Sequence, residues 1–241
     1  MQPRGCCRGI LTTNFMLLLH HHLLLNNANA VVASSSGDGR ALLEFKSGIS
    51  VDTTGILSTW LPTTNHCTDW EGVVCDPAEA IRVTSLLLQV PPEGYMKGTL
   101  SPSLGSLTSL ENLVITRTKH IAWNIPGTIS NLTRLNQLII EDFSIAGLIL
   151  PSIGSFRCLA SVSLARNRLN SSIPPSLWTL PSLQLLSLSQ NSLSGTISTA
   201  RSSGRIPTTF PNITFLDLSY IVSQAGSRRL CSPYRVSETS H

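Results

Sequence analysis

The amino-acid sequence predicts an α/β solenoid, in which one short unit is repeated along the chain and each copy packs on its neighbours. Three observations predict it. Leucine or a related aliphatic residue returns at a nearly constant spacing, an Asn follows the clearest copies at a fixed distance, and only 12% of the 241 residues are charged. Such spacing is typical of stacked repeats, because one unit cannot bury its apolar face alone.

The repeat is clearest over residues 183–197, which read L-x-x-L-x-L-x-x-N-x-L-x-G-x-I. Its L-x-L centre predicts a short strand whose apolar side chains alternate toward the core. We expect the amides of Asn167 and Asn191 to satisfy backbone groups in the turn after the strand. The second apolar anchor recurs every 24 to 30 residues and marks about six copies: Leu86, Leu113, Leu138, Val162, Leu186 and Leu216.

Some copies depart from this pattern. Thr118, Phe143 and Ile221 stand where the turn Asn is expected, so the turns there are predicted to be weaker. Trp123 replaces the Gly of its copy and is expected either on the side wall of the coil or as a contact for a partner. Residues 198–209 read as two repeat pieces joined with the body of one missing.

The N-terminus has the layout of a secretory signal peptide. Arg4 and Arg8 precede an apolar stretch over residues 10–25, and small residues follow it. We predict cleavage after Ala30, with Ala33 as the alternative site. An uncleaved membrane anchor is the competing interpretation, but the apolar stretch is short for a span. No window of 18 apolar residues follows residue 30, so no transmembrane anchor is expected after cleavage.

The repeat resembles that of the plant-type leucine-rich repeat family, whose unit is matched almost position for position over residues 180–197. Residues 38–46, 57–60 and 67–75 resemble the N-terminal cap of this family. Residues 94–100 are similar to its secreted members, the polygalacturonase-inhibitor-like and DNA-damage-toleration-like proteins. The resemblance implies a right-handed coil with a short parallel concave sheet and a helical, disulfide-bonded N-terminal cap.

This organisation divides the chain into four parts. Residues 1–30 are assigned to the signal peptide and residues 31–80 to the N-terminal cap. Residues 81–221 hold about six repeats, the last of which is degenerate, and residues 222–241 form an irregular C-terminal tail.

The cap can also be interpreted from its own residues. Asp38 is expected to cap a helix that ends near Gly48. Trp60 and Trp70 are large enough to cover the open end of the first coil. The apolar face of the helix is expected to be Ala41, Leu42, Phe45 and Ile49.

Cys67 and Cys75 lie eight residues apart, which favours a local disulfide in an oxidising compartment. A metal site is the alternative for this pair. It would need two more ligands, and His66 and Asp76 are the nearby candidates, but their spacing does not favour a tetrahedron. No metal site is therefore predicted.

Two further cysteines remain after cleavage, and their pairing is open. Cys158 is expected to be a buried free thiol. Cys231 resembles the start of the family's C-terminal cap, whose second Cys is missing here. It is therefore unpaired, or it pairs with Cys158, or the chain is a shortened family member.

The strand positions that face solvent are predicted to form a concave partner-binding surface. Arg117, Asp142 and Arg166 fall at equivalent positions, so they are expected to form a ladder of alternating charge. This ladder is either a weak network of surface ion pairs or a recognition patch for a charged partner. The predicted contact residues are Val114, Thr116, Arg117, Ile139, Glu141, Asp142, Ser163, Arg166, Ser187 and Gln190.

Three N-x-S/T sequons are candidate glycosylation sites in a secreted chain: Asn131, Asn170 and Asn212. All three lie outside the concave strand positions, so attached glycans would leave that surface free.

Other functional classes find little support. The net charge of +4 is spread along the chain, which argues against a nucleic-acid partner. His66, His120 and His241 show no spacing that implies a catalytic triad or a metal pair, so neither an enzyme nor a cofactor is predicted.

We therefore expect a secreted glycoprotein that binds a protein or cell-wall glycan in the plant apoplast. The resemblance implies a role in plant defence or cell-surface signalling. Two alternatives remain: an inhibitor of a microbial cell-wall-degrading enzyme such as a polygalacturonase, and a truncated, non-catalytic remnant of a receptor-like ectodomain.

Overall fold

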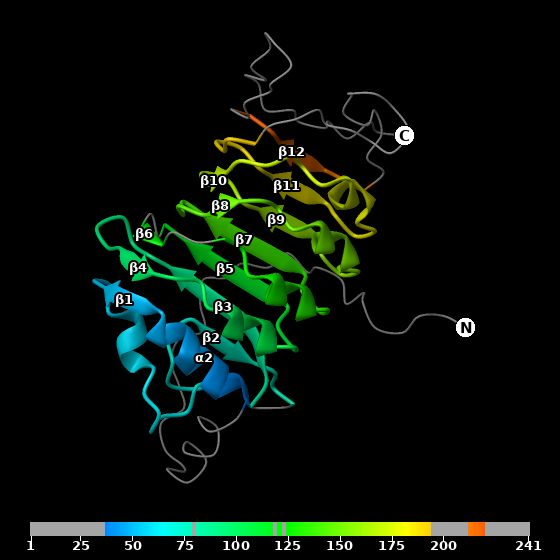
Figure 1. Ribbon diagram of the computed structural model, residues 1–241. Coiled ribbons are helices and arrows are strands. Elements are labelled where there is room, and N and C mark those ends of the chain that lie inside the picture. The colour runs from blue at the N-terminus through cyan, green and yellow to red at the C-terminus, as the bar shows by residue number, and fades with distance from the viewer. Residues whose placement is uncertain (1–36, 79–80, 118–119, 122–123, 194–211, 220–241) are drawn as a thin grey trace.

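Within the residues that the structure describes, seven short strands lie side by side and form the main sheet (Figure 1). This computed structural model describes residues 37–78, 81–117, 120–121, 124–193 and 212–219. β2 (Val73–Cys75) pairs antiparallel with β3 at the N-terminal edge, and all other pairings in this sheet are parallel. The stack confirms the predicted solenoid. Its parallel strands are β3 (Val83–Gln89), β5 (Asn112–Thr116), β7 (Gln137–Glu141), β9 (Ser161–Ser163), β11 (Leu185–Ser187) and β12 (Phe215–Asp217).

The apolar anchors of the repeat lie opposite one another across these strands. Each is paired in register with the anchor of the next coil, and all are at most 2% exposed. Residues paired in register point to the same face of a sheet, so this row forms a continuous core along the coil. The row consists of Leu86, Leu113, Leu138, Val162, Leu186 and Leu216.

Short 3-10 helices complete the coils between the strands. They are η2 (Pro102–Ser106), η3 (Gly127–Asn131), η4 (Pro151–Ser155) and η5 (Pro175–Thr179). A proline begins η2, η4 and η5, where its fixed φ suits the first helical position. Each helix adds one large buried aliphatic side chain to the core: Leu104, Ile129, Ile153 and Leu177.

Two smaller sheets lie beside the main one (Figure 1). β1 (Ile49–Asp52) of the cap pairs antiparallel with β4 (Met96–Gly98), which pairs in parallel with β6 (His120–Ile121). β8 (Ala146–Gly147) and β10 (Arg168–Leu169) form a parallel pair. A Cβ at Gly98 would lie 2.2 Å from the carbonyl oxygen of Gly48, so only glycine allows β4 to approach the cap this closely.

The cap contains the helix α2 (Gly37–Ser47) and the 3-10 helix η1 (Ile56–Thr59). As expected, α2 ends beside Gly48, but Ile49 belongs to β1 and not to the helix. Trp60 and Trp70 are buried with their rings stacked, 5.3 Å between centroids. The indole of Trp60 donates to the carbonyl of Glu71, so burial leaves this N–H satisfied.

The predicted capping role of Asp38 is wrong. Asp38 lies inside the first turn of α2 and is only 5% exposed. Its carboxylate accepts hydrogen bonds from the backbone N–H of Val83, at 2.8 Å, and from Nε of Arg82, at 3.2 Å. The side chain points to the beginning of β3 and not to its own helix end, so it joins the cap helix to the main sheet.

The turn asparagines act as predicted. The side-chain amide of Asn191 donates to the carbonyls of Leu164, Leu188 and Ser189, and its oxygen accepts from the backbone N–H of Leu169.

Phe143 occupies the equivalent position two coils earlier and is 4% exposed within the core. This coil therefore gains apolar contact in place of the hydrogen bonds of the Asn. The replacement of Asn by Phe143 does not simply weaken the turn.

Several sequence predictions fall outside the described residues. They are the signal peptide over 1–30, Thr118, Trp123, the junction over 198–209, Ile221, the tail over 222–241 and Cys231. Within the described part of the chain, no helix has the length and apolar character needed to span a bilayer.

Candidate functional site

The main sheet presents one face whose side chains alternate with those of the core. The predicted contact residues lie there or in the turns directly after the strands, and they differ in exposure. Arg117, Arg166 and Gln190 are exposed, whereas Thr116, Ile139, Glu141 and Asp142 are half-buried. Val114, Ser163 and Ser187 are buried, so these three offer little contact area.

Four turn residues, each one to three positions after its strand, have a left-handed backbone that the sequence did not predict. Arg117, Asp142, Arg166 and Gln190 have φ between 55° and 64°. The backbone N–H of each donates to a carbonyl of the next coil, at 2.9 to 3.3 Å. A non-glycine residue rarely adopts this conformation, and here the continuing ladder holds it. Four polar side chains therefore start from fixed points along one edge of the sheet.

The charges at this edge are paired unevenly. Arg166 donates through Nε to Asp142, at 2.7 Å, and through Nη2 to Glu141, at 2.9 Å. The hydroxyl of Ser163 donates to the other oxygen of Glu141. The hydrogen bond from Arg166 to Asp142 raises the pKa of Arg166, and burial opposes this effect.

The predicted ladder of three alternating charges is therefore only half formed. Arg117 makes no ion pair within the described residues, because Arg166 occupies both neighbouring carboxylates. Register alone placed the three charges in one row. It could not show that the longer reach of Arg166 would bring Glu141 into the network as well.

The face of the sheet changes in character along the coil. Leu87, Val114 and Ile139 are paired in register and form an apolar strip on the first coils. Ser163, Ser187 and Asp217 continue the same row on the later coils. The first coils thus form an apolar half of this face, and the later coils form a hydroxyl-rich half.

Asp217 accepts hydrogen bonds from serines of the hydroxyl-rich half. Burial raises its pKa, but hydrogen bonds from the backbone and side chain of Ser219 and from the hydroxyls of Ser189 and Ser187 outweigh burial. The pKa of Asp217 therefore lies below its ordinary value, and the carboxylate stays ionised at neutral pH.

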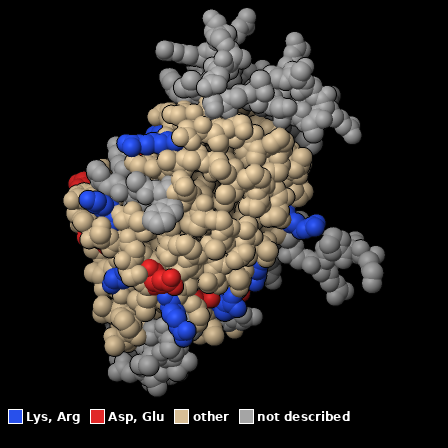
Figure 2. Space-filling view, viewed as in Figure 1, with Lys and Arg blue, Asp and Glu red and all other residues tan. Residues whose placement is uncertain are grey.

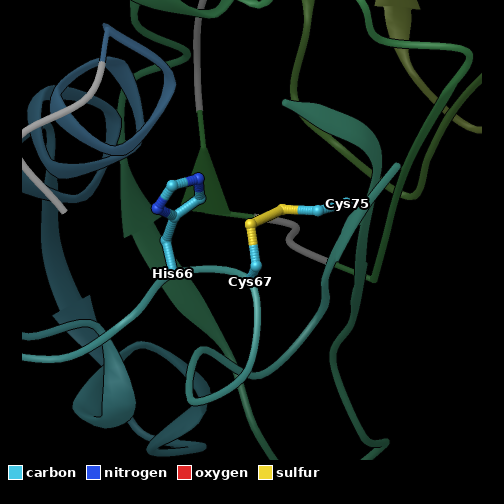
Figure 3. Close-up of side chains that lie close together, drawn as sticks. All are labelled: His66, Cys67 and Cys75. Carbon is cyan, nitrogen blue, oxygen red and sulfur yellow. A yellow bond between two sulfur atoms is a disulfide. The ribbon is translucent and has the colours of Figure 1, made fainter. Parts of the chain in front are cut away.

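The cap cysteines form the predicted disulfide, with Cα atoms 5.4 Å apart (Figure 3). His66 is buried beside it and packs edge-on against Trp70, while its Nε2 lies 3.2 Å from the carbonyl oxygen of Ile81. The donor atoms of His66, Cys67 and Cys75 lie within 4.8 Å of one another. Both sulfur atoms are used in the S–S bond, so the alternative of a metal held by two thiolates does not fit this arrangement.

The expectation of a free thiol at Cys158 is wrong. Cys158 is disulfide-bonded and half-buried. Cys158 lies between η4 and β9, and a repeat pattern of single coils carries no information on a cross-link.

The three sequons occupy different environments. Asn131 ends η3 and Asn170 follows β10, and both are exposed. Asn212 is also exposed, but its Nδ2 donates to the carbonyl of Pro181 at 2.8 Å. A glycan would replace one of the two hydrogens of Nδ2, so attachment at Asn212 would use the atom that makes this hydrogen bond. Figure 2 shows charged side chains scattered over a mostly uncharged face, with no broad patch of either sign.

Comparisons with known proteins agree with this architecture. Residues 35–76 match the family model described as "Leucine rich repeat N-terminal domain". The DNA damage-repair/toleration protein DRT100 of Arabidopsis thaliana is 37% identical over 111 residues, which are 42% of this chain and 30% of that protein. The chain therefore spans less than a third of the length of this relative.

Two solved structures are also similar. A chain in the BIR3–SERK2 complex from Arabidopsis thaliana is 31% identical, with a TM-score of 0.60, and the match covers 66% of this chain and 85% of that one. A plant ice-binding protein is 30% identical, with a TM-score of 0.61, over 67% of this chain and 50% of that one. Both the sequence and the backbone are thus similar to plant proteins built from the same repeat.

Proposed function

The chain belongs to the plant-type leucine-rich repeat family, and from that premise we propose that it is a secreted glycoprotein that binds a protein or cell-wall glycan. The binding surface is the concave face of the main sheet together with the row of turn residues at its edge. The role is recognition in plant defence or cell-surface signalling, in the apoplast or cell wall, and no step of chemistry is assigned to the chain.

The observation that carries this proposal is the row of left-handed turn residues. Arg117, Asp142, Arg166 and Gln190 are held by the backbone ladder before any partner arrives. A surface with preset side chains loses little conformational entropy on binding. The similar BIR3–SERK2 structure is a complex, which supports a protein partner for a chain of this architecture.

Capture from plant cell-wall extract tests the proposal. The full chain is immobilised beside Ile139→Arg, which alters the centre of the concave face, and Ser106→Arg, which alters an exposed position on η2 outside the main sheet. We expect the wild type and Ser106→Arg to retain the same partner and Ile139→Arg to lose it, with all three melting alike. Equal capture by the three chains would show that the concave face is not the binding surface.

Localisation is tested with the untagged gene product in plant tissue. We expect the chain in the wall fraction, with a mass that falls on glycosidase treatment and with glycans at Asn131 and Asn170. An unglycosylated chain in the cytosol would contradict the proposal.

A role as an inhibitor of a cell-wall-degrading enzyme can be tested in a separate assay. Mixing the chain with a microbial polygalacturonase should reduce the rate of polygalacturonate hydrolysis. Full enzyme activity in the presence of micromolar excess of the chain would reject this role and leave binding to another partner.

A further inference from the structure

A hollow of about 480 Å³ lies at the carboxyl-terminal edge of the main sheet. The loop over residues 91–95, between β3 and β4, forms one wall, and Arg117 and Asp142, which follow β5 and β7, form the other. Its volume falls within the range of pockets that hold small ligands or a few residues of a peptide. Tyr95 is 40% exposed, so part of this residue faces solvent at this edge.

The loop wall is fixed by contacts with the cap. The backbone N–H of Gly94 donates to the carbonyl of Pro91, at 3.0 Å, and Tyr95 exchanges hydrogen bonds with Thr53. A Cβ at Gly94 would lie 2.5 Å from Cγ2 of Thr54, so glycine lets the loop rest directly on the cap. Both walls are therefore built before a ligand binds, one on the cap and one on the sheet.

The hollow is bordered by two charges that have no ion-pair partner in the described part of the chain. Asp142 is neutralised by Arg166, as described above. Neither Arg117 nor Glu93 takes part in an ion pair within the described residues. One cation and one anion are thus left for groups that come from outside.

We propose that this hollow binds a peptide segment that carries one carboxylate and one basic group. The carboxylate pairs with the guanidinium of Arg117, which can bind it through two parallel hydrogen bonds, and the basic group faces Glu93. The ring of Tyr95 and the side chains of Pro91 and Pro92 contact the apolar part of the peptide. This inference rests on the proposed function and names the partner chemistry at one end of the same surface.

The charges that line the hollow favour a peptide ligand over an acidic polysaccharide. A chain of uronic acids presents carboxylates at every residue, and those that lie beside Glu93 would be repelled by it. A peptide of mixed charge can match both signs at once, because acidic and basic side chains can alternate along it.

A random heptapeptide display library provides the test. It is selected on the immobilised full chain, and the enriched peptides are then measured by titration against Arg117→Gln, Glu93→Gln and the matched control Arg134→Gln. Arg134 is exposed, pairs with Glu111 and does not line the hollow. We expect peptides with both acidic and basic residues, about tenfold weaker binding to Arg117→Gln and Glu93→Gln, and unchanged binding to Arg134→Gln. Equal melting temperatures show that the variants are folded.

The other outcomes overturn the inference in distinguishable ways. If the enriched peptides bind Arg117→Gln as well as the wild type but fail on Ile139→Arg, the hollow is not the site and the concave face still is. If no peptide is enriched while a galacturonate pentamer binds in a manner that depends on Arg117, the ligand is a glycan. If neither probe binds and wall extract yields no partner, the proposed function fails together with the inference.

Discussion

Single asparagine side chains complete the hydrogen bonding of the turns after β9 and β11. Asn167 is buried, and its Nδ2 donates to the carbonyls of Ile140, Leu164 and Ala165 while its oxygen accepts from the N–H of Ile145. Three carbonyls and one N–H from two coils therefore depend on one amide. A buried backbone group that loses its partner costs free energy, so this residue matters beyond its size.

Replacing this amide should destabilise the protein markedly. We expect Asn167→Ala to lower the free energy of unfolding by about 3 kcal/mol, because it leaves several buried polar groups without a partner. Asn170→Ala removes the same side chain from an exposed position and should cost less than about 0.5 kcal/mol. Denaturant unfolding of both variants gives the comparison. Similar losses for the two would show that the turn hydrogen bonds contribute little.

Asp52 makes the stability of the cap depend on pH. Burial raises its pKa, but hydrogen bonds from the side chain and backbone of Thr54 and from the N–H groups of Leu57 and Gly55 outweigh burial, and the pKa falls below 3.8. A lowered pKa in the folded state stabilises the protein above the unfolded value, and this contribution is lost as pH falls through the folded value.

We therefore expect the melting temperature to fall below about pH 4, where Asp52 begins to be protonated in the unfolded chain. Asp52→Asn should melt lower at pH 7 and change less between pH 5 and pH 2. Glu44→Gln, at an exposed position of α2, removes an equal charge and should keep the wild-type slope. The same slope in Asp52→Asn as in the wild type would refute this role.

Residue types and register were enough to predict the turn asparagines and the position of the charged row. They could not predict which carboxylates Arg166 would occupy, because that depends on side-chain reach across two coils. Nor could they predict the left-handed backbone at Arg117, since the usual signal for such a turn is glycine. Asp38 was misassigned for a similar reason: a local capping motif says nothing of a strand 45 residues away.

Among the elements, the cap shows how a disulfide supplements a small core. Cys67 and Cys75 close a loop beside the stacked rings of Trp60 and Trp70. Loop closure removes entropy from the unfolded chain, by about 2.5 kcal/mol for a loop of eight residues. The bond also keeps β2 against the beginning of the sheet, which would otherwise present an open edge.

The double variant Cys67→Ser, Cys75→Ser should unfold at a lower denaturant concentration, with a loss of about 2.5 kcal/mol. Mutation is needed because a reducing agent would also break the disulfide of Cys158. Tryptophan fluorescence reports on the cap directly. An unchanged midpoint would show that the aromatic core holds the cap without the bond.

The strands were predictable from the repeat of apolar residues, and the helix α2 was predictable from its local residue pattern. The 3-10 helices were not specified, since their short runs such as residues 102–106 carry no helical period. The pairing of β1 with β4 also had no sequence signal. The strands are only four and three residues long, and the paired residues Ile49 and Gly98 lie 49 positions apart in the chain (98 − 49).

As a whole, the molecule is a stack in which each coil contacts mainly its neighbours. Its stability is therefore close to a sum over coils and their interfaces, and the core row from Leu86 to Leu216 is its continuous element. The sequence predicted this architecture because every coil repeats the same signal. Aligning the copies on their anchors also places the apolar and the hydroxyl-bearing residues of the concave face in one row, and the strand pairing confirms that row: Leu87, Val114, Ile139, Ser163, Ser187 and Asp217.

The concave face of the main sheet is the surface that we propose binds the partner. Hydroxyl-radical footprinting of the full chain, alone and with the partner captured from wall extract, measures the accessibility of side chains directly. The account predicts lower oxidation of Leu87 and Ile139 in the complex, with unchanged oxidation of Leu148, which is exposed outside the main sheet. Protection of Leu148 with Leu87 and Ile139 unchanged would contradict it.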